Sequence, residues 1–221
     1  METMLMDHAK ARRTMVDCQV RTVDVTNPEL LDALLSVPRE NFVPAALAEL
    51  AYLDEELPLA GGRKLLASAP FAKLLQAASV QPGDNVLDVG CASGYSTAVI
   101  SKLCGSVTGL EVSPALAHQA RNSLEKIGIA NAKFVEGPLN IGHKAGAPYD
   151  VIFIGGSVGV IPQALLGQLA NGGRLVVVEG SGNAAMASLY VSRDGDISGR
   201  RLFNSAIAPL PGFERRAGFV F

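Results

Sequence analysis

The chain has 221 residues, of which 48% are hydrophobic, and its formal net charge is -2. That length allows one domain with a buried core. The small charge and the pI of ≈ 5.9 exclude the electrostatic attraction that drives general binding to nucleic acid or to anionic membranes. The sequence has no stretch approaching the ~18 continuous apolar residues that a membrane-spanning helix needs.

The cysteines and the first residues indicate a compartment. The three cysteines are an odd number without metal-ligand spacing, and they are Cys18, Cys91 and Cys104. Residues 1–8 lack the basic start and apolar core of a secretory signal. We therefore expect a cytoplasmic protein with reduced thiols and no metal site.

Helices and loops are expected over residues 1–75, as an extension packed on a core formed by residues 76–221. Asn27 and Pro28 suit the N-cap and the first position of a helix. The expected elements are, in order, a helix over 7–20, a helix over 28–35, a break at 38–44, a short helix over 45–51, a loop over 54–63 and a helix over 70–78.

From Asp84 onward, apolar runs alternate with helical segments. Strands are expected over 86–89, 107–112, 133–136, 151–154, 174–179, 188–192 and 200–203. Helices are expected over 95–103, from Pro114 to Gly128, and from Pro162 to 171–173. The alternation predicts a Rossmann-like α/β fold, in which a mostly parallel, seven-stranded sheet has helices on both faces. The last two strands are expected to form an antiparallel hairpin.

Two acidic residues end two of the expected strands. Asp88 precedes a turn through Gly90 and Gly94, and Glu111 ends the next strand. Parallel sheets bind ligands beyond the carboxyl ends of their strands. Glycine allows the backbone to turn tightly beside a ligand, and a carboxylate such as Glu111 can accept hydrogen bonds from both ribose hydroxyls. The pattern predicts a nucleoside site.

The charge of Asp88 indicates which nucleoside binds. A helix N-terminus suits a phosphate, but Asp88 would repel a pyrophosphate in a partly dry cleft. A dinucleotide fingerprint would also have glycine in place of Tyr95. A ligand with a ribose and a positive charge fits better, and S-adenosylmethionine carries an ammonium and a sulfonium. Two alternatives remain: a nicotinamide cofactor, or an ordinary strand-to-helix turn with solvated acids.

Five stretches narrow the prediction further. In sequence order they are Val37–Pro44, Ala51–Pro58, Ala67–Pro70, Val86–Gly90 and Ala147–Asp150. With these stretches the chain resembles class I S-adenosylmethionine-dependent methyltransferases, and more narrowly the protein-L-isoaspartate O-methyltransferase family. The resemblance covers residues 35–180.

The resemblance implies a function and a set of site residues. It implies methylation of the carboxylate of isoaspartyl residues in damaged proteins, which begins their repair. Ser68 would face the substrate carboxylate. The residues implied on the cofactor, together with the acid of the loop, are Leu66, Asp88, Gly90, Ala92, Gly94, Tyr95, Glu111, Gly137 and Pro138.

The chemistry of a carboxylate acceptor is compatible with these residues. A carboxylate with a pKa of about 4 is already ionised at neutral pH and needs no general base. Positioning and desolvation can then do most of the work in a displacement. Ser68 has no nearby histidine to activate it as a nucleophile. We expect Ser68 to donate a hydrogen bond to the acceptor carboxylate, or to cap the following helix.

Departures from the family pattern leave two other functions open. Leu66 replaces a threonine, and residues 208–221 do not match the family tail. These differences favour a diverged methyltransferase that acts on another acceptor. Pro138 replaces an acid beside the adenine, and Ala92 replaces a glycine of the loop. The loss of that acid favours a non-catalytic module that binds S-adenosylmethionine or a peptide. The oligomeric state is not specified by the sequence.

Overall fold

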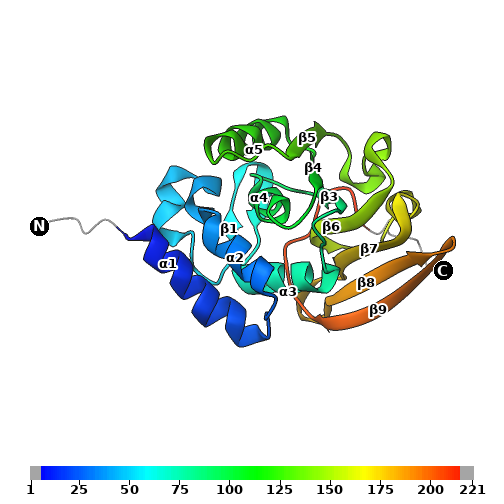
Figure 1. Cartoon of the computed structure of the whole chain (residues 1–221), viewed down its shortest axis with the longest axis horizontal. Coiled ribbons are helices and arrows are strands. Elements are labelled where there is room, and N and C mark those ends of the chain that lie inside the picture. Colours follow the sequence, from blue (N-terminus) through cyan, green and yellow to red (C-terminus); the bar gives the residue numbers. More distant parts are fainter. Residues whose placement is uncertain (1–5, 215–221) are drawn as a thin grey trace, which may run out of the picture.

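The computed structural model of the chain describes residues 6–214, which form an α/β fold around one seven-stranded sheet (Figure 1). The strand order is β5-β4-β3-β6-β7-β8-β9. Neighbouring strands from β5 to β7 are parallel, whereas β8 and β9 are antiparallel. The strands are β3 Asn85–Val89, β4 Ser106–Glu111, β5 Ala132–Glu136, β6 Tyr149–Val158, β7 Leu169–Glu179, β8 Met186–Arg193 and β9 Asp196–Asn204. The predicted fold class and closing hairpin are confirmed.

Helices cover both faces of this sheet, as the alternation predicts. Their bounds are α1 His8–Met15, α2 Pro28–Ser36, α3 Ser68–Ala78, α4 Tyr95–Ser101, α5 Pro114–Lys126 and α6 Gln163–Leu166. The N-caps at Asn27 and Ser113 are confirmed, since each side chain accepts a hydrogen bond from a first-turn amide. Among residues 6–214, no helix is long and apolar enough to cross a membrane.

The two faces of β3 point into two hydrophobic clusters. Val86 packs into the larger cluster, which contains side chains of α2 to α5. Leu87 and Val89 point into the smaller cluster with α6 and the segment near Leu210. Because side chains alternate along a strand, Asp88 shares the face of Val86. The carboxylate of Asp88 is thereby directed toward α4.

The N-terminal part departs from the expected helix and loop. The helix predicted over 7–20 is α-helical only to Met15 and continues as a π-helix, Val16–Val20. The loop predicted over 54–63 contains strand β1, Leu57–Pro58, which pairs with β2, Lys64–Leu65. The short helix predicted over 45–51 is a 3₁₀ helix, Ala45–Leu50. The division into an extension over 1–75 and a core over 76–221 stays a prediction.

Two other boundaries differ because of their local backbone. The helix predicted to begin at Pro70 begins two residues earlier, at Ser68. Proline is tolerated at Pro70 because amides in the first turn of a helix have no intrahelical acceptor, so no hydrogen bond is lost. The helix after Pro162 ends at Leu166, so its predicted end at 171–173 is wrong. Those residues lie in β7, beside an irregularity in its pairing with β6. An extra segment in one strand produces such an irregularity.

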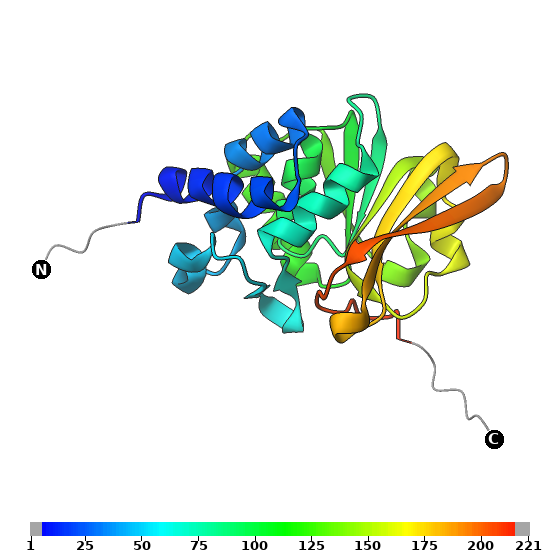
Figure 2. The same cartoon turned by 90° about the horizontal axis from the view of Figure 1, so that it is seen from below.

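The segment after β9 returns across the carboxyl edge of the sheet. Figure 2 shows it in red beside the cyan β1–β2 hairpin. The backbone amide of Ser157 in β6 donates to the carbonyl of Ala208 at 2.9 Å. The backbone carbonyl of Ser157 accepts from the amide of Leu210, also at 2.9 Å. Glu56 accepts from the amide of Ala208 at 2.7 Å. We call residues 205–213 the C-terminal strap. Residues 215–221 of the tail lie outside the described residues.

Candidate active site

The turn after β3 is built on left-handed backbone conformations. Gly90 has φ +77° and Gly94 has φ +94°, which glycine adopts without a steric penalty. A Cβ atom on Gly94 would lie 2.8 Å from the Cβ of Ala120, so glycine also lets the loop pack on α5. Ala92 has φ +49° and is 4% exposed. The structure thus has an alanine in a backbone conformation that favours glycine.

Asp88 is fully buried beneath this turn. Its Oδ2 accepts hydrogen bonds from Ser96 Oγ at 2.6 Å and from Thr97 Oγ1 at 2.7 Å. Its Oδ1 has no hydrogen-bond partner among residues 6–214. Burial raises the pKa of Asp88 to about 6, against the opposing effect of the two hydroxyl donors. A buried, unpartnered carboxylate oxygen beside a turn is chemically suited to a cationic ligand.

Glu111 is equally buried at the end of β4. Its Oε1 accepts from the amides of Val112 and Ser113, at 3.0 and 3.1 Å. Its Oε2 accepts from the amide of Ala92 at 2.8 Å. The side chain therefore fixes the turn after β3 to the turn after β4. Asp88 and Glu111 lie on neighbouring parallel strands at the same sheet edge, as predicted.

Arg63, which no motif in the sequence marks, forms an ion pair with Glu111. Its Nη2 lies 3.3 Å from Glu111 Oε2 and donates to the carbonyl of Gly90 at 2.8 Å. The arginine is 7% exposed, and its Nε finds no acceptor in the described part of the chain. Arg63 follows a 3₁₀ turn, Ala60–Gly62, at the tip of the β1–β2 hairpin. The guanidinium partly neutralises an otherwise anionic sheet edge.

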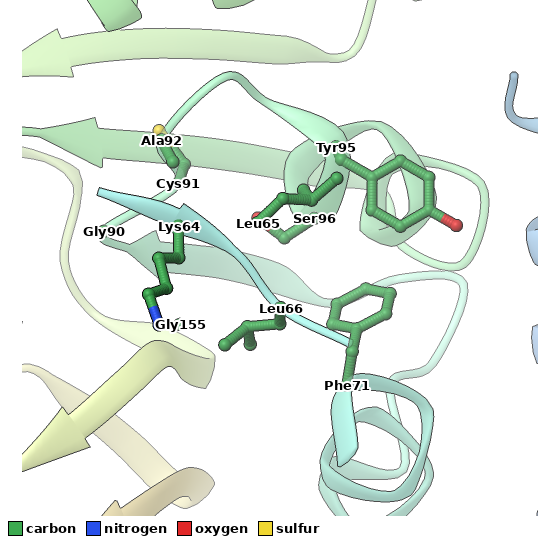
Figure 3. A pocket seen from close by; sticks show the side chains of 10 residues that line it. All are labelled: Lys64, Leu65, Leu66, Phe71, Gly90, Cys91, Ala92, Tyr95, Ser96 and Gly155. Atoms are coloured by element: carbon green, nitrogen blue, oxygen red, sulfur yellow. The ribbon is translucent and has the colours of Figure 1, made fainter. Parts of the chain in front are cut away.

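A small cavity lies between the glycine turn and the β1–β2 hairpin (Figure 3). The space open to the centre of a water molecule is ≈ 20 Å³, which is room for only one or two waters. Four predicted cofactor residues line the cavity, namely Leu66, Gly90, Ala92 and Tyr95. The other lining residues are Lys64, Leu65, Phe71, Cys91, Ser96 and Gly155. Gly90 and Ala92 of the glycine turn thus lie beside Leu66 and Tyr95 around one cavity.

Whether the site fits S-adenosylmethionine depends on its chemistry and on its room. The chemistry fits, because unpartnered buried oxygens of Asp88 and Ser93 surround the turn, counted over residues 6–214. The room is restricted by two side chains. A Cβ atom on Gly90 would lie 2.8 Å from Leu210 Cδ2 and 3.0 Å from Arg63 Nη2. The site therefore has polar atoms suited to the cofactor. Arg63 and Leu210 reduce the room that is left for it.

Ser68 occupies the first position of α3 and is 1% exposed. Its hydroxyl donates to Gln19 Oε1 at 2.6 Å and lies 3.5 Å from Asp54 Oδ1. Gln19 belongs to the π-helix and donates to the carbonyl of Tyr52 at 2.9 Å. Within the described residues, α3 has no side-chain cap, so the capping alternative for Ser68 is wrong. The π-helix thus supplies Gln19 as a partner of the predicted catalytic serine.

Arg39 holds the segment of Leu66 in place. Its guanidinium is fully buried, donates to the carbonyls of Ala51 and Leu66 at 2.6 Å each, and lies 4.8 Å from the ring centre of Tyr95. Burial lowers the pKa of this guanidinium below its usual value. The Tyr95 ring also packs against Phe71, with ring centres 5.6 Å apart. Arg39 therefore joins the segment before α3 to the start of α4.

Gly137 and Pro138 follow β5, next to the end of β4. The amide of Gly137 donates to the carbonyl of Glu111 at 3.1 Å. Pro138 begins the 3₁₀ turn Leu139–Ile141. Neither residue lines the small cavity. Four other predicted site residues do not line it either, namely Ser68, Asp88, Gly94 and Glu111. The predicted contact of Gly137 and Pro138 with the adenine stays a prediction.

Comparison with known proteins shows the same family over most of the chain. The family model for protein-L-isoaspartate(D-aspartate) O-methyltransferase matches residues 10–214. Protein-L-isoaspartate O-methyltransferase 1 of Rhodopseudomonas palustris (strain HaA2) is 35% identical over 208 residues, which cover 93% of this chain and 85% of the relative. The enzyme of Koribacter versatilis (strain Ellin345) is 35% identical over 210 residues, and 94% of each chain is covered.

Solved structures agree. A protein-L-isoaspartate O-methyltransferase is 25% identical, with a TM-score of 0.78 over 91% of this chain and 66% of its own. A Plasmodium falciparum structure in complex with S-adenosyl-L-homocysteine has the same fold, with 20% identity and a TM-score of 0.79 over 93% of this chain and 99% of its own. Fold and site define a class I S-adenosylmethionine-dependent methyltransferase. The chain belongs to the protein-L-isoaspartate(D-aspartate) O-methyltransferase family.

The backbone of Ala92 leads to a first expected result. Replacing Ala92 with glycine is expected to stabilise the protein by about 1 kcal/mol, because the native φ is positive. Urea unfolding measures this change. The variant is also expected to bind S-adenosylhomocysteine more tightly, since a methyl group is removed from the cavity wall. Ala98→Gly, within α4, is the control and is expected to lose stability. A loss of stability in Ala92→Gly would contradict the assignment of strain.

Proposed function

We propose that this protein transfers the methyl group of S-adenosylmethionine to the carboxylate of isoaspartyl residues in polypeptides. The observation that carries the proposal is the pair of buried carboxylates, Asp88 and Glu111, on neighbouring strand ends beside a glycine turn. The family supplies the acceptor: the relatives in Rhodopseudomonas palustris and Koribacter versatilis are named for isoaspartate. The anionic edge supports the choice of a cationic nucleoside over a phosphorylated one.

Each site residue has a proposed role in this reaction. When bound, the cofactor supplies a methyl group on a positively charged sulfur. Asp88 would hold the ammonium of the methionine end, and Glu111 would hold the ribose hydroxyls. Leu66 and Tyr95 would exclude water from the reacting atoms. No base is required, because the acceptor carboxylate is ionised at neutral pH.

Ser68 is proposed to orient the acceptor. Its hydroxyl donates to Gln19, whose own amide is fixed by the carbonyl of Tyr52. An incoming carboxylate would replace Gln19 Oε1 as the acceptor of the hydrogen bond that the Ser68 hydroxyl donates. Ser68→Ala is therefore expected to lower kcat more than it changes cofactor affinity.

The proposed activity is tested by methyl transfer to two peptides that differ in one linkage. Radiolabelled S-adenosylmethionine is incubated with an isoaspartyl peptide and with the aspartyl peptide of the same sequence. We expect methyl ester only on the isoaspartyl peptide, and loss of the ester on standing through a succinimide. Transfer to neither peptide, with cofactor binding intact, would overturn the proposed substrate.

A second candidate function is a peptide-binding module that neither binds the cofactor nor catalyses transfer. One observation favours it: the guanidinium of Arg63 already contacts the carbonyl of Gly90 and the carboxylate of Glu111. In that case S-adenosylhomocysteine would produce no thermal shift in the wild-type protein. A ligand that binds only the native state raises the apparent stability, so a shift would favour the enzyme.

We also propose that the substrates are polypeptides encountered in the cytoplasm. The thiols of Cys18, Cys91 and Cys104 are all free, which supports a reducing compartment.

A further inference from the structure

Two side chains from distant segments pack against Gly90 of the glycine turn. Arg63 comes from the tip of the β1–β2 hairpin, and Leu210 comes from the C-terminal strap. A Cβ atom on Gly90 would be 2.8 Å from Leu210 and 3.0 Å from Arg63. A Cβ atom on Gly156 would likewise lie 2.7 Å from Leu210. The two side chains therefore fill the room above the turn.

The contacts of Arg63 resemble those expected of a cationic nucleoside. Its Nη2 donates to the carbonyl of Gly90 at 2.8 Å and approaches Glu111 Oε2 at 3.3 Å. Glu111 is the proposed ribose acceptor, and the carbonyl of Gly90 is an acceptor beside the buried carboxylate of Asp88. A guanidinium combines positive charge with several N–H donors. It can therefore satisfy both acceptors while the cofactor is absent.

This internal contact is incomplete, which makes it displaceable. The Nε of Arg63 is buried without an acceptor anywhere in residues 6–214. The strands on either side of the loop that contains the arginine have two residues each. Gly61 and Gly62, before the arginine, have positive φ, and a Cβ atom on either would meet no neighbouring atom. The ion pair of Lys64 with Glu56 beside it is partly exposed. Ala60, Gly61 and Gly62, before the arginine, are exposed to solvent.

We propose that Arg63 is an internal ligand of the cofactor site, which S-adenosylmethionine displaces when it binds. Leu210 closes the remaining room, so the closed form excludes the cofactor. The inference depends on the proposed function only for the identity of the cofactor. The apparent affinity of a ligand falls with the fraction of protein in the competent form. Removing the arginine should therefore tighten binding.

The first experiment measures the binding of S-adenosylhomocysteine by calorimetry. Arg63→Ala and Arg63→Gln are compared with the wild type. Two variants are used so that the test still stands if one of them does not fold. We expect both to bind at least tenfold more tightly. Arg21→Ala is the matched control, since Arg21 forms an exposed ion pair with Asp17. We expect its affinity to equal that of the wild type.

The second experiment begins without the cofactor. Methylguanidinium at millimolar concentration is added to Arg63→Ala, to Arg21→Ala and to the wild type, and thermal unfolding is followed. We expect it to raise the Tm of Arg63→Ala alone, because the vacated acceptors can bind a small guanidinium. It should also weaken the binding of S-adenosylhomocysteine to that variant by competition. Equal effects on Arg21→Ala would indicate a general salt effect and would overturn the assignment.

The outcomes separate this inference from the proposed function. If Arg63→Ala and Arg63→Gln bind S-adenosylhomocysteine no more tightly than the wild type, the internal ligand is excluded, whether or not isoaspartyl peptide is methylated. If both bind more tightly but no peptide is methylated, the internal ligand stands and the proposed substrate falls. Absence of binding in every variant would overturn both.

Discussion

Replacement of Asp88 by asparagine is expected to stabilise the protein at pH 7.5 while weakening cofactor binding. In the folded protein, burial raises the pKa of Asp88 to about 6, from an ordinary value of 3.8. Each pKa unit corresponds to about 1.4 kcal/mol, so the ionised group destabilises the fold by up to ~3 kcal/mol. Asparagine avoids this charge and can still accept from the hydroxyls of Ser96 and Thr97.

The sign of the pH dependence follows from the raised pKa of Asp88. Between about pH 4 and pH 6 the folded protein binds more protons at Asp88 than the unfolded chain does. Wild-type stability therefore falls as pH rises through this range, and Asp88→Asn removes that contribution. Urea unfolding at pH 4.5 and 7.5 should show a gain for the variant only at the higher pH. Asp17→Asn, at an exposed position, is the control.

The same substitution should weaken S-adenosylhomocysteine binding by about 10- to 100-fold, because a charged hydrogen bond contributes roughly 1.5–3 kcal/mol. In the wild type, affinity should increase with pH as Asp88 ionises. Calorimetry between pH 5 and 7.5 measures both effects. A stability gain of equal size at pH 4.5 and 7.5 would show that packing, and not charge, is responsible.

Glu111→Gln is expected to be strongly destabilising. Both carboxylate oxygens of Glu111 accept hydrogen bonds, from three backbone amides and from Arg63. A glutamine side chain has one acceptor and one donor group, so its NH₂ would face other donors. Breaking a buried ion pair on one side costs about 3–5 kcal/mol. We expect a loss of this size in urea unfolding at pH 7.5, together with loss of cofactor binding.

A double-mutant cycle isolates the ion pair of Glu111. Arg63→Met combined with Glu111→Gln should be less destabilising than the sum of the single changes, with a coupling of about 1–3 kcal/mol for residues in contact. The control cycle is Arg121→Met with Glu136→Gln, because that pair is 39% and 42% exposed. Its coupling should be below about 1 kcal/mol. Additive effects at Arg63 and Glu111 would contradict a direct interaction.

Local signals in the sequence predicted much of the fold and the position of the two acids. Asp88 and Glu111 end apolar runs, and the edge of a parallel sheet brings such positions together. Asn27 and Ser113 precede prolines, which is typical of helix starts. Each of these signals depends on a few neighbouring residues, so it can be read from the sequence without knowledge of tertiary contacts.

The residues that were missed depend on distant partners. Arg63 contacts Gly90 and Glu111, which are 27 and 48 residues away, and no local pattern marks it. Gln19 reaches Ser68 through a π-helix, which periodicity predicts as an ordinary helix. The glycines at 172 and 173 are typical of a helix end, although the structure has them in β7. Tertiary contacts decided each case.

The clamp formed by Arg39 has a consequence for how the site gains and loses order. One buried guanidinium bonds the carbonyls of Ala51 and Leu66, and the segment between them includes Arg63. Local unfolding of this segment would leave the buried guanidinium of Arg39 without either carbonyl acceptor. This cost opposes the unfolding of only part of the segment. Amide protons from residue 39 to residue 66 should therefore exchange with solvent as a single cooperative unit. The cofactor pocket and the N-terminal helices would melt together.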